Sequence, residues 1–286
     1  MSDQDRPRVD GVVLAYRPDV SIIPNVEALA EQVGRVYVVN NSPGELDDEV
    51  LRAFLDDPRI ALLDQGGNVG VAAGFNAGIR AALDDGAEFV WIFDQDSTVS
   101  PGMLSAVVDV YLSHPGRTGI VAPALRSHAT GVVYRREQGA GSGEVDTLIS
   151  SGSLLSRDLI ERIGMHDEAL FIDYVDHDIS LRARAAGLHN IKVYDVLLEH
   201  RFGDSDPVRF AGRNIYLSHY SPLRQYYMAR NRMILLRRYG IGRWFWSDLW
   251  FTAKAWVKVL MFERDRRTKI GAFFRGWRDG VRFPRR

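Results

Sequence analysis

The stretch FVWIFDQDS, residues 89–97, decides the fold class because a short apolar run leads directly into two carboxylates. Five consecutive apolar residues are typical of a strand that is buried on both faces of a parallel sheet. Asp94 and Asp96 follow the run at positions i and i+2. Side chains alternate in extended chain, so both carboxylates point to one side and can converge on a single cation. The alternative is a strand-end turn with solvated acids.

Three similar apolar runs lie upstream, and stretches with the length and spacing of helices separate them. Strands are predicted at Val12–Ala15, Val36–Val39, Ile60–Leu63 and Phe89–Phe93, and helices at Ile23–Val33, Leu46–Leu55 and Val71–Leu83. This alternation predicts an α/β fold with a mostly parallel sheet. Ligands bind beyond the carboxyl ends of such strands. The polar residues at these ends are therefore candidates for ligand contact: Tyr16, Arg17, Asn40, Asn41, Ser42, Asp64, Gln65, Asp94, Gln95 and Asp96.

After residue 115 the pattern changes to shorter elements. Strands are predicted at Gly119–Pro123, Val132–Arg135 and Asp146–Ser150, with a mobile glycine-rich loop at Gly139–Gly143. A helix over Asp176–Ala186, ended by Gly187, precedes a strand pair around Ile191–Leu198. No linker marks a firm boundary before about residue 205.

Composition excludes several classes of protein. The 286 residues are 46% hydrophobic and 26% charged, which is ordinary for a globular protein and excludes a disordered or collagen-like chain. The absence of cysteine excludes disulfides, thiolate nucleophiles and Cys-ligated metals. The first ten residues, MSDQDRPRVD, lack the basic and apolar regions of a signal peptide, so we expect a cytoplasmic protein.

Small residues recur every four positions at Gly70, Gly74 and Gly78, which predicts a helix face that another backbone, or a ligand, can approach closely. The spacing is not G-x-G-x-x-G, so the sequence lacks the dinucleotide-binding fingerprint. Asn68 is a candidate N-cap for this helix. The positive end of the helix could instead face an anionic ligand.

Two further positions each have a structural and a functional interpretation. Asp176 lies at a predicted helix start, where it is either a cap or a general base. His200 ends an apolar run, where it is either structural or a third ligand for Mn²⁺ beside carboxylates. Asp178 and Arg182 are four residues apart, which predicts a surface or interdomain ion pair.

From Val12 to about Gly203 the sequence resembles family 2 glycosyltransferases of the GT-A fold, and more narrowly their bacterial rhamnosyltransferase branch. Four blocks carry the resemblance in order: VVNNSPGE (38–45), NVGVAAGFNAGI (68–79), FDQDS (93–97), and SSGSLLS with FIDYVDHDISLRARAAG (150–156 and 171–187). A fifth block, SPLRQYYMARNRMILLRRY (221–239), extends the resemblance toward the C-terminus. The resemblance implies a GT-A type, Rossmann-like sheet flanked by helices. It divides the chain into a catalytic domain, 1–205, and a helical extension, 206–286. Within the catalytic domain, about 9–115 would bind the nucleotide and about 116–205 the acceptor.

The resemblance also implies roles for single residues. Asp96 would bind the metal directly, Asp94 would lie near the ribose and the metal, His200 would complete the metal site, and Asp176 would be the catalytic base. Asn40 and Asn41 stand where the family usually has Asp-Asn, and Val175 stands where it usually has Glu. The nucleotide-sugar site would comprise Tyr16, Asn40, Asn41, Asp64, Asn68, Asn76, Asp94 and Gln95. The acceptor side would comprise Ser151, Gly152 and Ser153.

The implied reaction is inverting and dependent on Mn²⁺ or Mg²⁺. Its donor would be dTDP-L-rhamnose, and its acceptor a bacterial surface polysaccharide such as lipopolysaccharide, or a lipid-linked oligosaccharide. The nearest alternative is the same machinery with another donor, such as a UDP-hexose or galactofuranose.

The C-terminal part has a composition of its own. Residues 224–286 carry 17 Lys and Arg against four acids, and five of the six tryptophans. The mixture of Trp and Lys over Trp244–Phe262 predicts a helix lying on an anionic membrane, at the cytoplasmic face of the inner membrane. The alternative is a helical cap on the catalytic domain or a homodimer interface. A nucleic-acid-binding module is a further alternative, against which the acidic residues 1–223 argue, so we expect no nucleic-acid partner.

Overall fold

The computed structural model describes residues 6–44, 46–114, 116–128, 131–133, 137–200, 206–210, 213–217 and 219–284. The chain divides into two compact units. The sheet unit comprises Met1–Phe171 and Val175–Arg201, and the helical unit comprises Ile172–Tyr174 and Phe202–Arg286. The three residues Ile172–Tyr174 therefore belong to the helical unit, although their neighbours on both sides in the sequence belong to the sheet unit.

The sheet unit alternates strands and helices along its first half. Its strands are β1 (Val9–Ala15), β2 (Val36–Asn40), β3 (Ile60–Asp64), β4 (Phe89–Asp94), β5 (Ser97–Thr98), β6 (Thr118–Ser127), β7 (Ser142–Val145), β8 (Ser153–Ser156) and β9 (His189–His200). Its helices are α1 (Ile22–Ala30), α2 (Asp48–Asp56), α3 (Val71–Asp84), α4 (Met103–Leu112), α5 (Arg157–Ile163) and α6 (Val175–Ala185), with the short 3₁₀ helix η3 (Glu168–Leu170).

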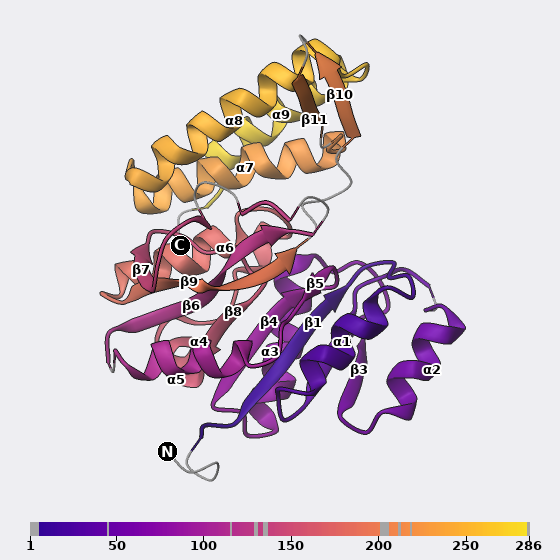
Figure 1. Ribbon diagram of the computed structural model, residues 1–286. Helices are drawn as coiled ribbons and strands as arrows, with labels where there is room; N and C mark the ends of the chain where they lie inside the picture. Colours follow the sequence, from indigo (N-terminus) through magenta and orange to yellow (C-terminus); the bar gives the residue numbers. More distant parts are fainter. Residues whose placement is uncertain are drawn as a thin grey trace. The chain divides into compact units, whose positions relative to one another are not determined.

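The central sheet runs in the order β3-β2-β1-β4-β8-β6-β9-β5, and β7 pairs with β9 (Figure 1). The four strands β3, β2, β1 and β4 are parallel to one another, and β8 is antiparallel to both β4 and β6. Because these four strands are parallel, their carboxyl ends share one edge of the sheet. The order of the strands along the chain reverses between β1 and β4. The α/β fold with a mostly parallel sheet is confirmed, and this edge is where a ligand is expected.

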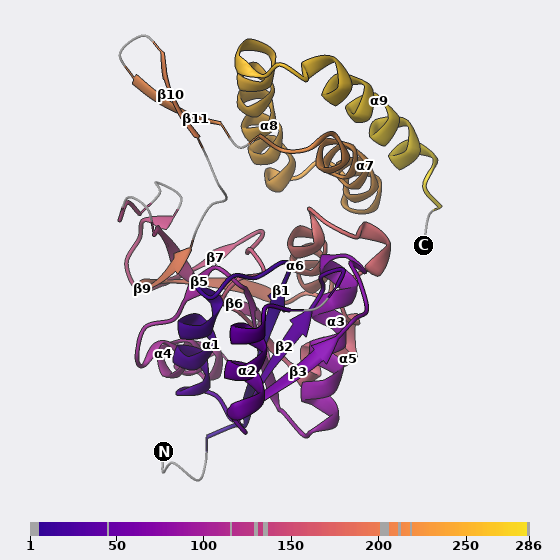
Figure 2. The same ribbon diagram turned by 90° about the vertical axis from the view of Figure 1, so that its right-hand side faces the viewer.

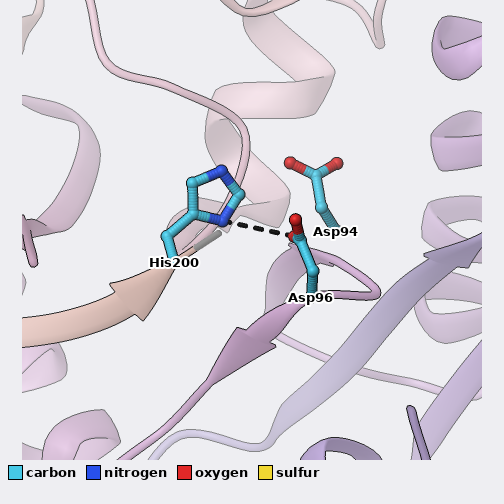
Figure 3. A group of neighbouring side chains, drawn as sticks. All are labelled: Asp94, Asp96 and His200. Carbon is cyan, nitrogen blue, oxygen red and sulfur yellow. Dashed lines mark ion pairs between the residues drawn. The ribbon is translucent and has the colours of Figure 1, made fainter. Parts of the chain in front are cut away.

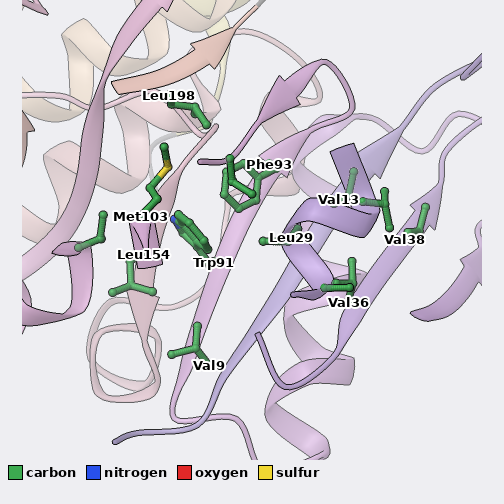
Figure 4. Close-up of a cluster of buried hydrophobic side chains, with 14 of the residues drawn as sticks. Val9, Val13, Leu29, Val36, Val38, Trp91, Phe93, Met103, Leu154 and Leu198 are labelled. Atoms are coloured by element: carbon green, nitrogen blue, oxygen red, sulfur yellow. The ribbon is translucent and has the colours of Figure 1, made fainter. Parts of the chain in front are cut away.

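Each face of the sheet has its own apolar core. Val9, Val13 and Trp91 belong to a core that includes residues of α1, α2 and α4 (Figure 4). Val12 and Ile92 belong to a second core that includes residues of α3, α5 and α6. Neighbouring residues of one strand thus enter different cores, which explains why the strands read as continuous apolar runs rather than as alternating patterns.

Several predicted boundaries need correction. The predicted strand Asp146–Ser150 is wrong, because β7 ends at Val145 and β8 begins only at Ser153. The predicted strand pair around Ile191–Leu198 is one long strand, β9. In the predicted strand Val132–Arg135, Val133 forms an isolated bridge to Arg126. Residues 134 and 135 of this predicted strand lie outside the described part of the chain.

The glycine stripe packs as predicted. A Cβ atom at Gly74 would collide with Leu14, and one at Gly78 would collide with Val12, both on β1. The N-cap of α3 is Gly70 rather than Asn68, and the Asn68 Oδ1 accepts a hydrogen bond from the Gly70 backbone N–H at 3.0 Å. The stripe therefore brings α3 close to the sheet.

The described residues of the helical unit form a hairpin and three helices (Figure 2). Its elements are β10 (Asp206–Phe210), β11 (Arg213–Leu217), α7 (Pro222–Tyr239), α8 (Arg243–Phe262) and α9 (Arg266–Arg282). Gly276 and Gly280 let α9 approach the backbone of α7, because a Cβ atom at either position would collide with a carbonyl oxygen of that helix. Among the described residues, no helix has the length and apolar character needed to cross a bilayer.

Candidate active site

Three potential metal ligands meet although they come from distant parts of the sheet unit. Asp94 ends β4, Asp96 lies in the following turn, and His200 ends β9. One ligand atom from each lies within 4.8 Å of the others (Figure 3). Pairing of Ser97 on β5 with His200 on β9 brings the histidine to the two acids. Two carboxylates and one imidazole suit Mg²⁺ or Mn²⁺.

Hydrogen bonds of Ser97 and Ser151 hold these potential ligands in position. The His200 Nδ1 lies 3.3 Å from the Asp96 Oδ1 and 3.0 Å from the Ser97 Oγ. The Ser97 Oγ in turn lies 2.8 Å from the Ser151 Oγ, which accepts a hydrogen bond from the Asp94 backbone N–H. One chain of hydroxyls therefore connects the backbone of Asp94 to the ring of His200.

The charges at the site favour binding of a cation. Burial raises the pKa of the Asp94 carboxyl, and the carboxylates of Asp96 and Asp176 raise it further, against the opposing effects of His200 and Ser151. Negative charges that destabilise one another in this way are relieved by a divalent cation. The three side chains thus fit a divalent metal ion in both chemistry and electrostatics.

Asp176 lies in the first turn of α6 and has a local partner. Its Oδ1 accepts hydrogen bonds from the backbone N–H and from the ring Nδ1 of His177, at 2.8 and 3.0 Å. Burial raises the pKa of Asp176, but the charge and the hydrogen bonds of His177 outweigh burial and hold the pKa below its ordinary value. The lowered pKa favours the ionised carboxylate, and 22% of the side-chain surface is exposed to solvent.

The ends of the neighbouring strands carry a group of amides and a carboxylate. The Asn40 Nδ2 donates to the Asp64 Oδ1 at 3.3 Å, and the Asn41 Nδ2 donates to the Asn68 Oδ1 at 3.4 Å. Asn40 and Asn41 are almost completely buried, whereas Asp64 and Asn68 are exposed. The buried amides of Asn40 and Asn41 thus orient two exposed hydrogen-bond acceptors, Asp64 and Asn68, at the edge of the sheet.

Gln95 connects the acidic turn to the end of β1. Its side-chain Oε1 accepts a hydrogen bond from the Tyr16 backbone N–H at 2.7 Å, and its backbone oxygen accepts one from Asn25 at 3.0 Å. The Tyr16 ring is 42% exposed, and the Arg17 guanidinium lies over it at 5.4 Å. An exposed aromatic ring at this edge can stack on a planar ligand.

Other candidate residues use their polar atoms within the fold. The Asn76 amide bonds the backbone of His166 in both directions and also the Glu168 carboxylate. The Ser153 hydroxyl donates to the Ile149 oxygen, and the Gly152 oxygen accepts from the Trp91 indole. Ser151 and Ser153 are buried, and the hydrogen bonds of their hydroxyls go to other residues of the fold. The assignment of Asn76 to the nucleotide-sugar site and of Ser151, Gly152 and Ser153 to the acceptor side stays a prediction.

The Asp178–Arg182 pair differs from the expected surface or interdomain pair. The two side chains lie 2.9 Å apart, but the Asp178 carboxylate is fully buried. Arg182 also donates to the backbone oxygens of Ile163 and Met165. The pair therefore fixes α6 to the segment after α5.

Sequence reasoning missed two supporting residues. Ser97 directly follows the acidic pair, and His177 directly follows Asp176, so proximity in the sequence was the available signal. Neither was singled out because a serine or histidine beside an acid is common in any surface turn.

Comparison with known sequences identifies relatives. The family model described as "Glycosyl transferase family 2" matches residues 12–170. The chain is 31% identical over 243 residues to the dTDP-rhamnosyl transferase RfbF of Shigella flexneri, which is 79% of each chain. It is also 29% identical over 145 residues to the uncharacterized protein Rv1525 of Mycobacterium tuberculosis, covering 46% of this chain and 55% of the relative.

Solved structures share the fold at low sequence identity. TarS 1–349 of S. aureus matches with a TM-score of 0.66 and 13% identity, over 96% of this chain and 81% of that one. GalNAc-T7 with UDP, GalNAc and Mn²⁺ matches with a TM-score of 0.62 and 11% identity, over 98% and 57%. The mannosyltransferase PcManGT of Pyrobaculum calidifontis, in complex with GDP-Man and Mn²⁺, matches with a TM-score of 0.59 and 18% identity, over 93% and 74%.

Proposed function

Because the chain belongs to glycosyl transferase family 2, we propose that it is an inverting, metal-dependent transferase that moves L-rhamnose from dTDP-L-rhamnose to a glycan or lipid-linked acceptor. The 31% identity to a dTDP-rhamnosyl transferase over 79% of both chains supports the choice of donor. We propose a bacterial surface polysaccharide, such as lipopolysaccharide, or its lipid-linked precursor as the product.

The observation that carries the proposal is the convergence of Asp94, Asp96 and His200 within 4.8 Å. These residues would hold Mn²⁺ or Mg²⁺, which supplies Lewis-acid stabilisation of the departing diphosphate when bound. Ser97 and Ser151 keep the ligands in place through their hydrogen bonds to His200 and to the backbone of Asp94.

Asp176 is the proposed general base. It would accept the proton of an acceptor hydroxyl while the hydroxyl oxygen forms a bond to the anomeric carbon. The bond from that carbon to the diphosphate oxygen breaks at the same time, and its electron pair leaves with the nucleoside diphosphate. Direct displacement by an acceptor on the face opposite the leaving group inverts the anomeric configuration, and no covalent enzyme intermediate is needed.

The strand ends would bind the nucleotide. Tyr16 offers an exposed ring for stacking, and Asp64 and Asn68 offer exposed acceptors for the base or ribose. Asn40 and Asn41 orient these acceptors by hydrogen bonds, and Gln95 holds the backbone of Tyr16.

The test is a donor panel with controlled metal. Purified enzyme is incubated with dTDP-L-rhamnose, UDP-glucose, UDP-galactofuranose or GDP-mannose, and release of nucleoside diphosphate is measured after chelation and after addition of Mn²⁺ or Mg²⁺. We expect turnover with dTDP-L-rhamnose that chelation abolishes and either cation restores. Equal turnover after complete chelation would contradict the proposed metal dependence. Preference for a UDP-sugar would contradict dTDP-L-rhamnose as the donor.

We also propose that α8 lies on an anionic membrane surface, at the cytoplasmic face of the inner membrane, where a lipid-linked acceptor would be met. Trp246, Trp250 and Phe251 are each more than 60% exposed. The Lys254 ammonium lies 4.5 Å from the centre of the Trp250 ring. Exposed aromatic rings beside lysines are typical of helices that lie in the headgroup region of anionic bilayers.

Co-sedimentation with vesicles tests this surface. Vesicles with and without phosphatidylglycerol are mixed with wild type, with Trp246→Ser/Trp250→Ser, and with Lys254→Glu/Lys258→Glu, at low and high salt. The matched control is Arg52→Glu/Leu55→Ser, which changes similarly exposed residues on α2. We expect both α8 variants to lose binding to the anionic vesicles. Retained binding would contradict the proposal, and a dimer in solution that these variants dissociate would assign the surface to a second copy of the chain.

A further inference from the structure

The segment before the proposed base has an unusual backbone. Phe171, Asp173 and Tyr174 all have positive φ angles, of 64°, 62° and 65°. Aspartate tolerates this left-handed region, but a bulky aromatic residue adopts it only where its surroundings enforce it. Two such aromatic residues within four positions indicate that strong contacts hold this segment.

At its upstream end, the segment is anchored within the sheet unit. The Phe171 backbone oxygen accepts hydrogen bonds from the N–H groups of Val71 and Ala72, at the start of α3. The Phe171 ring occupies the space that a Cβ atom on Gly70 would need. Phe171 is therefore fixed independently of the residues that follow it.

The next three residues are held by the helical unit. The Arg224 guanidinium on α7 forms a bidentate ion pair with the Asp173 carboxylate, at 3.0 to 3.2 Å. The fully buried Asn231 amide donates to the backbone oxygens of Ile172 and Asp173, both at 2.8 Å.

Tyr174 has a third attachment. Its hydroxyl donates to the Asp248 Oδ1 on α8 at 2.6 Å, and the Asp248 Oδ2 accepts from Arg232 on α7 at 2.6 Å. The Arg232 guanidinium also lies over the Tyr174 ring, 5.4 Å from its centre. Every residue of Ile172–Tyr174 is thus bound by a side chain of α7 or α8.

This segment leads directly into α6. Val175 follows Tyr174 and begins the helix, and Asp176 is the second residue of its first turn. A change in the backbone of Tyr174 therefore moves the start of α6 and with it the Asp176 carboxylate, because only one residue intervenes.

We propose that Arg224, Asn231 and Arg232 are positioning residues for Asp176, which they place by holding Ile172–Tyr174 in its left-handed conformation. This inference rests on the proposed role of Asp176 as the base. It assigns to the helical unit a contribution to catalysis that is separate from any membrane contact of α8.

The main test compares Arg224→Gln, Asp173→Asn and Arg224→Lys with the control Tyr226→Phe. Asparagine tolerates the left-handed backbone as aspartate does, so Asp173→Asn removes the charge without adding strain. Tyr226 lies on α7 like Arg224, and Tyr226→Phe removes a hydrogen bond from the tyrosine hydroxyl to Asp279 on α9. Turnover is expressed per donor-binding site, measured by titration with the nucleoside diphosphate, so a partly unfolded preparation does not distort the comparison.

We expect Arg224→Gln and Asp173→Asn to lower kcat by about 10- to 100-fold, with the donor KM changed less than about 2-fold, because a small misplacement of a reacting group has this cost. Arg224→Lys should recover part of the loss, and Tyr226→Phe should match the wild type. In an Asp176→Asn background, Arg224→Gln should lower kcat no further.

Two results would overturn the inference: wild-type kcat in both Arg224→Gln and Asp173→Asn, or a full additional loss when Arg224→Gln is combined with Asp176→Asn. Failure of the proposed function has a different signature. In that case Asp176→Asn alone would keep wild-type turnover, whatever the Arg224 variants do.

Discussion

The Ser97 hydroxyl lies 3.0 Å from the His200 Nδ1, although 103 residues separate them in the sequence. The two residues are paired neighbours on β5 and β9, two strands whose pairing encloses the acidic turn. The hydroxyl fixes the ring plane of His200 and so determines how the imidazole faces Asp94 and Asp96. Ser97 would therefore support the proposed metal site without being a ligand.

Ser97→Ala should weaken metal binding. Residues that orient a metal ligand typically contribute about 10- to 100-fold to affinity. We expect the Mn²⁺ concentration for half-maximal activity to rise by that factor, with kcat recovering at saturating Mn²⁺. The matched control is Ser113→Ala, whose hydroxyl donates to the Val110 backbone oxygen and contacts the neighbouring His114 ring. An unchanged Mn²⁺ titration curve would contradict the role of Ser97.

Asp176→Asn should abolish proton abstraction and leave donor binding intact. Asparagine has the same shape but cannot accept the acceptor proton, so kcat should fall at least about 100-fold. Calorimetric titration with dTDP should give an unchanged Kd in the presence of Mn²⁺. Turnover close to wild type would exclude Asp176 as the base.

His177→Gln should change the pH dependence of the reaction. The charge and hydrogen bonds of His177 outweigh burial and lower the pKa of Asp176, so removing the ring must raise that pKa. The acid limb of the kcat/KM profile should therefore move to higher pH, and the variant should lose activity at mildly acidic pH where the wild type remains active. A profile that moves to lower pH, or does not move, would show that another group controls this limb.

His166 should make the protein sensitive to acid. Its ring is buried beside Phe75, and neither ring nitrogen has a hydrogen-bond partner among the described residues. Burial, assisted by the charge of Arg182, lowers the pKa of His166 to about 3 from 6.5. Below pH 6.5 His166 binds a proton in the unfolded chain but stays neutral in the folded chain. Above pH 6.5 it is neutral in both states, so its titration does not lower the free energy of unfolding there. Below that pH, the free energy of unfolding falls by up to about 1.4 kcal/mol per pH unit, until the pH approaches the folded pKa.

The substitution His166→Phe tests this effect. Phenylalanine keeps a ring against Phe75 and removes the titrating group. Thermal melts of wild type and variant between pH 7.5 and pH 5 should diverge as the pH falls, with the variant losing less stability. Parallel curves over that range would mean that His166 does not contribute.

Gly78→Ala should destabilise the sheet unit, because the new Cβ would collide with the buried Val12 side chain on β1. Inserting a methyl group into such a contact costs about 1–3 kcal/mol. Gly271→Ala in α9 is the matched control, since its Cβ would meet only the end of Arg275. That change should instead stabilise by about 0.5–1 kcal/mol, because alanine favours helix over glycine. Urea unfolding of both variants measures the difference.

The sequence predicted the parallel half of the sheet well because each of its strands is buried on both faces. Val12–Ala15, Val36–Val39, Ile60–Leu63 and Phe89–Phe93 all lie within observed strands. The predicted strand Asp146–Ser150 failed because that segment has a strand-like composition but connects β7 to β8. Local composition carries no information on which strand a segment will pair with.

The same limit applies to the site. The spacing of Asp94 and Asp96 at the end of one strand makes them candidate metal ligands, although a strand-end turn with solvated acids has the same spacing. The contact of His200 with Ser97 depends on the two-residue strand β5, which is too short to leave a pattern. The burial of Asp178 depends on the packing of α6, and its spacing to Arg182 is the same as that of an exposed pair.

The chain passes between its two units three times, at Phe171, at Tyr174 and at Arg201. No single peptide bond can therefore be cut to release an intact sheet unit, because a fragment ending at Arg201 keeps Ile172–Tyr174 but loses Arg224, Asn231 and Asp248. Insertions, fusions or exchanges of the C-terminal helices between relatives must preserve those three side chains together with the segment they bind. The sheet unit is therefore continuous in sequence with a segment whose conformation depends on side chains of α7 and α8.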